Sequence, residues 1–97
     1  MTARIRTHPG EILKEEFLVP LDMSANALAR ELGVPANRVT AILKGTRGVT
    51  ADSALRLARY FGTTPDFWIN LQTAYDLSLA RAKSGRAIER TIRPRAA

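Results

Sequence analysis

The chain has 97 residues, of which 45% are hydrophobic, which suits a single domain with one modest core and not a cleft between two domains. It contains no cysteine, which excludes disulfides, zinc–thiolate sites and thiol nucleophiles and fits a reducing cytoplasm. Because no apolar run is long, we expect neither a membrane span nor a secretory signal. The formal net charge of +6 favours polyanions or acidic surfaces as partners, with basic residues gathered at 30–59 and 81–97 and acidic residues at 7–22.

The spacing of apolar residues predicts an all-α fold of five helices. Three of these helices are preceded by good N-cap residues, Ser24, Thr50 and Thr64, and glycines follow the second, third and fourth. Pro9 suits the first turn of the first helix, which Pro20 is expected to stop. The predicted ranges are about 9–18, 25–32, 35–43, 51–61 and 65–83.

The fifth helix is long for so small a chain and carries apolar residues on one side. We expect its unburied part to pack against a second copy of the chain, although an intramolecular lid is the simpler alternative. Beyond Gly85 the helical pattern is lost, and Ile88 and Ile92 suit a short strand or a frayed last turn. The predicted domain is therefore 1–84, followed by a basic C-terminal tail at 85–97. The expected dimer interface contains Trp68, Leu71, Tyr75 and Leu79.

Residues 25–44 have the pattern of a helix-turn-helix. Two helices that cross closely need a small residue at the crossing, a flexible residue in the turn, and apolar residues on the second helix. Ala29 and Gly33 supply the first two, and Val39 and Ile42 supply the third. An ordinary helical hairpin with the same pattern by chance is the alternative.

The third helix is then the recognition helix, and the residues opposite its buried side face the bases of DNA. Asn37 can bind adenine through two hydrogen bonds, although a solvated amide is an equally simple interpretation, and nearby methyl groups can pack on thymine. We expect Arg56 and Arg59 to form ordinary surface pairs. The predicted base-reading residues are Ala36, Asn37, Arg38, Thr40, Ala41 and Lys44. The predicted phosphate-binding residues are Ser24, Asn26, Arg30, Thr46 and Arg47, with Lys44 beside them.

An enzymatic function has little support in the sequence. His8, the only histidine, precedes a proline at a helix entry, where a capping or exposed role is common. Acidic residues in a first helical turn are expected from the helix dipole alone, so Glu11 and Glu15 do not indicate a catalytic pair. We expect no catalytic residue, metal or cofactor.

Five segments of the chain form a recognisable set: Thr-His-Pro-Gly-Glu-Ile-Leu (7–13), Leu-Gly-Val-Pro-Ala-Asn-Arg-Val (32–39), Ile-Leu-Lys-Gly-Thr-Arg-Gly-Val-Thr-Ala-Asp (42–52), Ala-Leu-Arg-Leu-Ala-Arg-Tyr-Phe-Gly-Thr (54–63) and Phe-Trp-Ile-Asn-Leu-Gln (67–72). Together they resemble the HigA family of antitoxins, within the XRE class of phage-repressor-like proteins. The resemblance covers about residues 7–82. It implies a five-helix homodimer that binds a palindromic operator, represses its own toxin–antitoxin operon and neutralises a HigB toxin, a ribosome-dependent mRNA endonuclease of the RelE type. Lys44 departs from the asparagine common in the family, and the basic tail matches no family pattern.

The charge distribution adds a hypothesis about the toxin surface. Such toxins resemble basic RNA-binding nucleases, so the acidic first helix has the complementary sign and the basic tail does not. The tail would instead attract phosphates, or be disordered without a role. Two other functions stay open: a solitary repressor without a toxin, and a helical module that binds only protein. The expected toxin-binding residues are Glu11, Glu15, Glu16 and Asp22.

Overall fold

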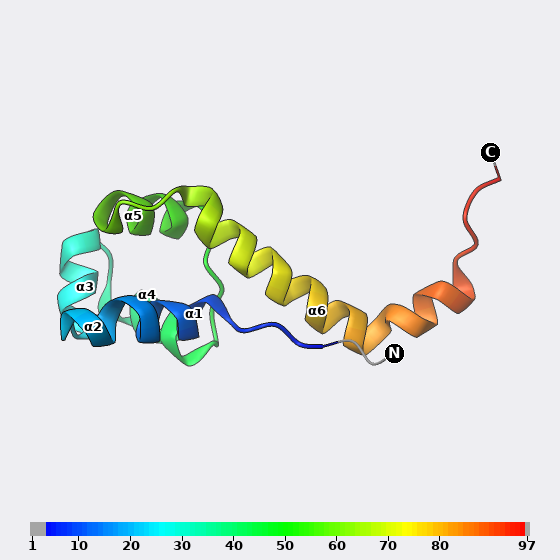
Figure 1. Cartoon of the computed structure of the whole chain (residues 1–97), viewed down its shortest axis with the longest axis horizontal. Coiled ribbons are helices and arrows are strands. Elements are labelled where there is room, and N and C mark those ends of the chain that lie inside the picture. The colour runs from blue at the N-terminus through cyan, green and yellow to red at the C-terminus, as the bar shows by residue number, and fades with distance from the viewer. Residues whose placement is uncertain (1–3, 97) are drawn as a thin grey trace.

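A computed structural model describes residues 4–96 of the chain. All regular structure in this range is helical and forms five helices, which confirms the predicted all-α fold (Figure 1). The first helix consists of three consecutive segments, α1 (Pro9–Ile12), the π-helical η1 (Leu13–Leu18) and α2 (Val19–Leu21). The other four are α3 (Ala25–Leu32), α4 (Ala36–Lys44), α5 (Ala51–Phe61) and α6 (Pro65–Thr91).

The first helix runs past Pro20, so the predicted end at residue 18 is wrong. A proline inside a regular α-helix lacks the amide hydrogen for the i−4 bond, and its ring clashes with that carbonyl. Here the chain widens into the π-helical segment η1 before the proline, and the N–H of Val19 bonds to the carbonyl of Lys14, five residues back. The helix ends only at Asp22, whose φ of 50° is left-handed.

The predicted caps of the middle helices are confirmed. Ser24 Oγ accepts a hydrogen bond from the N–H of Ala27 at 3.1 Å and begins α3. Helix α3 ends at Gly33, whose φ is 70°. This left-handed backbone conformation is sterically allowed for glycine, which has no Cβ. Pro35 is the N-cap of α4 and has extended backbone, so α4 begins at residue 36 and not at 35.

The core lies between the first helix, α3, α4, α5 and the first turns of α6. Trp68 is at its centre with 0% exposure, and its indole N–H donates to Thr63 Oγ1 at 2.8 Å. The Phe17 ring lies 5.2 Å from the Trp68 ring and 4.7 Å from the Phe61 ring, centroid to centroid. Trp68 therefore belongs to the core of its own chain, and its predicted place in a dimer interface is wrong. The other fully or nearly fully buried apolar side chains include Leu13, Leu28, Val39 and Leu57.

Helix α6 continues to Thr91, so the predicted end near residue 83 and the alternative of a strand at Ile88 are wrong. A single glycine inside a helix costs only about 1 kcal/mol relative to alanine, and Gly85 is followed by good helix formers. The distal half of α6 projects from the helical globule and gives the molecule a longest extent of 52 Å (Figure 1). The segment before α1 runs along α6, where the N–H of Arg6 donates to the buried Ser78 Oγ at 2.9 Å.

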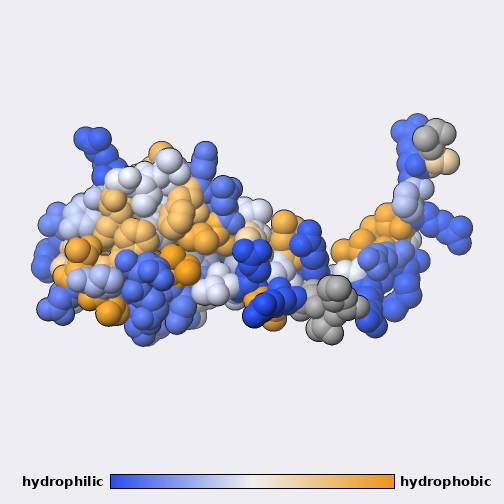
Figure 2. Space-filling view, in the orientation of Figure 1, coloured by the Kyte–Doolittle hydropathy of each residue, from blue (hydrophilic) through white to orange (hydrophobic). Residues whose placement is uncertain are grey.

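Apolar residues gather in patches on the visible face of the globule with hydrophilic residues around them, and the projecting end of α6 shows hydrophilic residues beside an apolar patch (Figure 2). Within residues 4–96, no helix combines the length and the apolar character that crossing a membrane requires.

Candidate nucleic-acid interface

Helices α3 and α4 form the predicted helix-turn-helix. The chain turns at Gly33, and the N–H of Val34 bonds back to the carbonyl of Ala29 at 3.0 Å. Ala29 is buried where the helices meet, and Val39 and Ile42 bury the inner side of α4. Because one side of α4 is buried in this way, its opposite side is presented to solvent as a recognition helix requires.

The exposed side of α4 carries most of the predicted base-reading residues. Ala36 and Asn37 are exposed in its first turn, and Lys44 is exposed at its end. Thr40 and Ala41, between them, are partly exposed. No side chain caps this helix, and the N–H of Arg38 bonds to the carbonyl of Pro35 at 3.1 Å. The amides of Ala36 and Asn37 are the ones that can meet a phosphate or a base.

Thr40 has only part of its hydrogen-bonding capacity available. Its hydroxyl donates to the carbonyl of Ala36 at 3.0 Å, one helical turn back. The oxygen can still accept a bond from an amino group of adenine or cytosine, and the methyl group can contact a thymine methyl.

Arg38, the remaining predicted base-reading residue, does not share this exposed side. Its guanidinium Nη1 lies 2.6 Å from Asp52 Oδ2, at the start of α5. The ion pair holds the Arg38 side chain toward α5 and away from the exposed side of α4, where Asn37 and Thr40 lie. This pairing could not be predicted from local patterns, because the two residues are distant along the chain.

The predicted phosphate-binding residues lie at two places beside α4. Asn26 and Arg30 are exposed on α3, and Arg47 is exposed in the loop after α4. The N–H groups of Thr46 and Arg47 both bond to the carbonyl of Ala41, at 3.0 and 3.2 Å. The Thr46 hydroxyl donates to the same carbonyl at 3.2 Å, so the Arg47 guanidinium is the group in this loop that can reach a phosphate. Ser24 uses its oxygen as the cap of α3, which leaves its hydroxyl hydrogen to donate.

Gln72 of α6 fixes the loop between α4 and α5, a role that no local pattern in the sequence indicates. Its Oε1 accepts a hydrogen bond from the N–H of Val49 at 2.7 Å, and its Nε2 donates to Asp76 at 2.9 Å. The Gln72 amide packs so closely on Gly48 that a Cβ there would lie 2.9 Å from the amide carbon. Helix α6 therefore holds the loop that carries Arg47.

A groove of about 640 Å³ lies between the first helix, the start of α3 and the outer side of α4. The first helix and the recognition helix α4 therefore lie side by side and form the two walls of this groove. Its lining is Lys14, Leu18, Val19, Asp22, Met23, Ser24, Ala25, Thr40, Leu43 and Lys44.

The predicted toxin-binding residues are all on the first helix or at its end. Glu11, Glu15 and Glu16 are exposed, and Asp22 is exposed at the edge of the groove. Of these four residues, Asp22 lines the groove together with Thr40 and Lys44 of α4.

The predicted dimer residues on α6 have different surroundings. Leu71 is partly buried against the core, and Tyr75 packs edge-on against His8 with ring centroids 4.8 Å apart. Leu79 is exposed, as are Leu77 and Ile88. Of the predicted residues, Leu79 is therefore the one exposed on α6, and Phe67 at the start of the helix is exposed to the same extent.

His8 caps the first helix. Its Nδ1 accepts a hydrogen bond from the N–H of Gly10 at 2.8 Å. Burial lowers the pKa of His8 below its ordinary value, and the negative charge of Asp76 opposes this effect in part. Among residues 4–96, no three His, Cys, Asp or Glu side chains come together as a metal site.

Comparison with known protein families and structures supports the assignment of α3 and α4 as a helix-turn-helix. The helix-turn-helix family model matches residues 13–68, which places the chain in that class. Virulence-associated protein I of Dichelobacter nodosus is 56% identical over 73 residues, which cover 75% of this chain and 68% of the relative.

Two solved structures are similar over nearly their whole length. An addiction module antidote protein of the HigA family from Coxiella burnetii has 58% identity and a TM-score of 0.90, with 95% of this chain and 100% of that chain covered. The Pseudomonas aeruginosa antitoxin HigA, solved with the higBA promoter, has 50% identity and a TM-score of 0.90, with coverage of 93% and 98%. The chain belongs to the HigA family of helix-turn-helix antitoxins.

Proposed function

We propose that the chain is the antitoxin of a type II toxin–antitoxin system, acting in the cytoplasm without catalytic activity or cofactor. It binds operator DNA as a homodimer, represses its own operon and neutralises a HigB/RelE-like mRNA endonuclease. The observation that carries the operator-binding part is the exposed side of α4, with Asn37 in an uncapped first turn. The promoter complex of the 50% identical Pseudomonas antitoxin supports the same assignment.

The base-reading role falls on Ala36, Asn37, Thr40, Ala41 and Lys44, and phosphate binding falls on Ser24, Asn26, Arg30 and Arg47. Residues 1–84 supply this domain, and 85–97 form the basic C-terminal tail, whose first part is the end of α6. The dimer uses the exposed apolar residues of α6, including Leu79.

Operator binding is tested by fluorescence anisotropy with DNA from upstream of the gene and with a scrambled duplex. Asn37→Ala should weaken operator binding by about 1–3 kcal/mol, the value of one bidentate base contact, and leave binding to the scrambled duplex unchanged. Asn70→Ala is the matched control, since Asn70 is exposed on α6. Equal affinity of the wild type for both duplexes would favour a helical module that binds only protein.

Toxin neutralisation is tested by charge reversal on the first helix. The double variant Glu15→Lys, Glu16→Lys should weaken binding to the toxin encoded beside the gene, because these exposed carboxylates attract a basic surface. Operator binding should persist, and Glu89→Lys, on the distal part of α6, is the control. Unchanged toxin affinity would rule out this surface, and absence of any adjacent toxin gene would favour a solitary repressor.

A further inference from the structure

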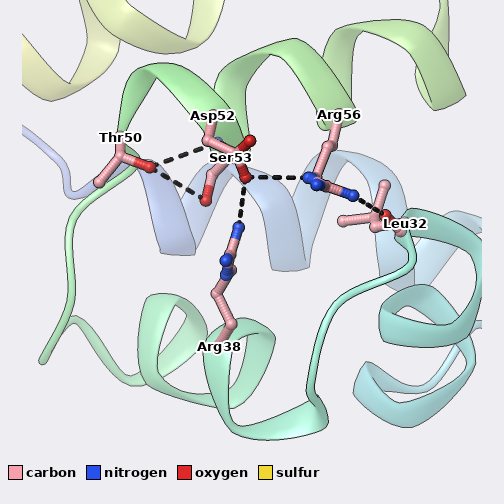
Figure 3. A network of polar contacts seen from close by, with 6 residues as sticks. All are labelled: Leu32, Arg38, Thr50, Asp52, Ser53 and Arg56. Atoms are coloured by element: carbon pink, nitrogen blue, oxygen red, sulfur yellow. Dashed lines mark hydrogen bonds and ion pairs between the residues drawn. The ribbon is translucent and has the colours of Figure 1, made fainter.

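One carboxylate links the recognition helix to α5. Asp52 Oδ2 accepts a hydrogen bond from Arg38 Nη1 at 2.6 Å and another from Arg56 Nε at 2.9 Å (Figure 3). Arg56 Nη1 in turn donates to the carbonyl of Leu32 at 2.8 Å, at the end of α3. The network therefore joins both helices of the helix-turn-helix to the start of α5.

Asp52 occupies a fixed position. It lies in the first turn of α5, where Thr50 Oγ1 caps the helix by accepting from the N–H of Ser53 at 3.3 Å. The hydrogen bonds from Arg38 and then from Arg56 hold the pKa of Asp52 below its ordinary value.

The position of Arg38 makes this pairing relevant to DNA. Arg38 is in the first turn of α4, next to Asn37, and a free guanidinium there could bind a phosphate of any sequence. Such a contact needs no matching base, so it strengthens complexes with non-operator DNA, whose register is not fixed by base contacts, more than it strengthens the operator complex. An adjacent carboxylate offsets the positive charge and ties down one of the guanidinium nitrogens.

We propose that Asp52 is a positioning residue that raises operator specificity by holding Arg38 against α5 and away from DNA phosphates. Discrimination is then made by Asn37, Thr40 and Lys44 on the exposed side of α4. This proposal rests on the proposed function, because it concerns how the same surface separates an operator from other DNA.

The test compares Asp52→Asn with the wild type by fluorescence anisotropy on operator and scrambled duplexes over a series of salt concentrations. Release of Arg38 should add one phosphate contact to the complex with scrambled DNA, which makes the slope of log K against log salt steeper by about 0.9. The ratio of operator to scrambled affinity should fall about two- to fivefold. Asp52→Glu, which keeps the charge, should retain most of the ratio.

Three variants distinguish the positioning of Arg38 by Asp52 from an effect of net charge or of fold stability. Asp66→Asn removes an acid at the same place in α6, where no arginine of residues 4–96 forms an ion pair with it, and controls for net charge. Arg56→Gln breaks the other half of the network and should lower the melting temperature without changing the slope. In an Arg38→Gln background, Asp52→Asn should no longer alter the slope.

The proposal is wrong if Asp52→Asn changes the slope no more than Asp66→Asn, or if its effect survives in the Arg38→Gln background. Equal weakening on both duplexes would also overturn it, because that is the result of a purely structural role. These outcomes differ from failure of the proposed function, in which the wild type itself does not distinguish the operator.

Discussion

Gly10 shows how closely the first helix packs against the recognition helix. A Cβ placed on Gly10 would lie 1.9 Å from the carbonyl oxygen of Ile42, which belongs to α4. Since this neighbour is backbone and not a flexible side chain, the two helices would have to separate to admit even a methyl group. Glycine is required at this position because a side chain would collide with the backbone of α4. The backbone conformation of Gly10 does not require glycine, because its φ is not positive.

Gly10→Ala should therefore destabilise the fold by about 1–3 kcal/mol, the usual cost of overpacking. The measurement is urea unfolding followed by circular dichroism. Gly85→Ala is the control, because a Cβ there would meet only Arg81 Cβ at 3.9 Å, and it should stabilise α6 by about 0.5–1 kcal/mol. Equal stability of the wild type and Gly10→Ala would contradict the described packing.

His8 gives the fold a dependence on pH. Its pKa is lower in the folded chain than the ordinary value of 6.5, because burial and its role as hydrogen-bond acceptor favour the neutral ring. The unfolded chain therefore binds a proton first as the pH falls. Stability should be complete above pH 6.5 and decrease as the pH falls through that value to the lower pKa of the folded state.

Urea unfolding between pH 7.5 and 5.5 tests this expectation. His8→Asn is the informative variant, because asparagine is also a good N-cap and does not titrate. As His8 is the only histidine, the variant should show little change across this range. A wild type equally stable at both ends would show that the cap is not coupled to protonation.

At the scale of elements, helix α6 connects three parts of the molecule. Its first turns complete the core, Gln72 holds the loop after the recognition helix, and Ser78 binds the segment before α1. The distal part of α6 contains several arginines and projects away from the rest of the described chain (Figure 1). It therefore adds little to the stability of the fold.

Removal of residues 86–97 should flatten the salt dependence of DNA binding, because the segment holds an excess of basic residues that attract phosphates over a distance. The affinity ratio between operator and scrambled duplex should stay the same. Binding measured over a salt series at constant pH checks both expectations. An unchanged slope would mean that the tail does not approach the DNA.

Across the whole molecule, the parts that could be predicted from sequence are those set by local patterns. The helix-turn-helix rests on the small residue Ala29, the left-handed Gly33 and the buried stripe of α4, and each is visible in the sequence. Helix caps such as Ser24 act within a few residues and were predicted correctly.

The features that were missed depend on three-dimensional context. Pro20 remains inside the first helix because a π-helical segment precedes it, and local propensity gives no sign of that segment. Trp68 has the spacing of an interface residue but fills the centre of the core. Arg38 has the spacing of a base-reading residue, yet its orientation depends on Asp52, a partner that only the tertiary fold brings near.

The most direct test of the central claim is the affinity of the purified wild-type chain for its own upstream DNA and for a scrambled duplex, measured from low to physiological salt. Operator binding should exceed non-specific binding by at least about a thousandfold, the range typical of specific regulators, with the preference retained at physiological salt. Affinities that are equal for the two duplexes at every salt concentration would contradict the assignment of α4 as a recognition helix.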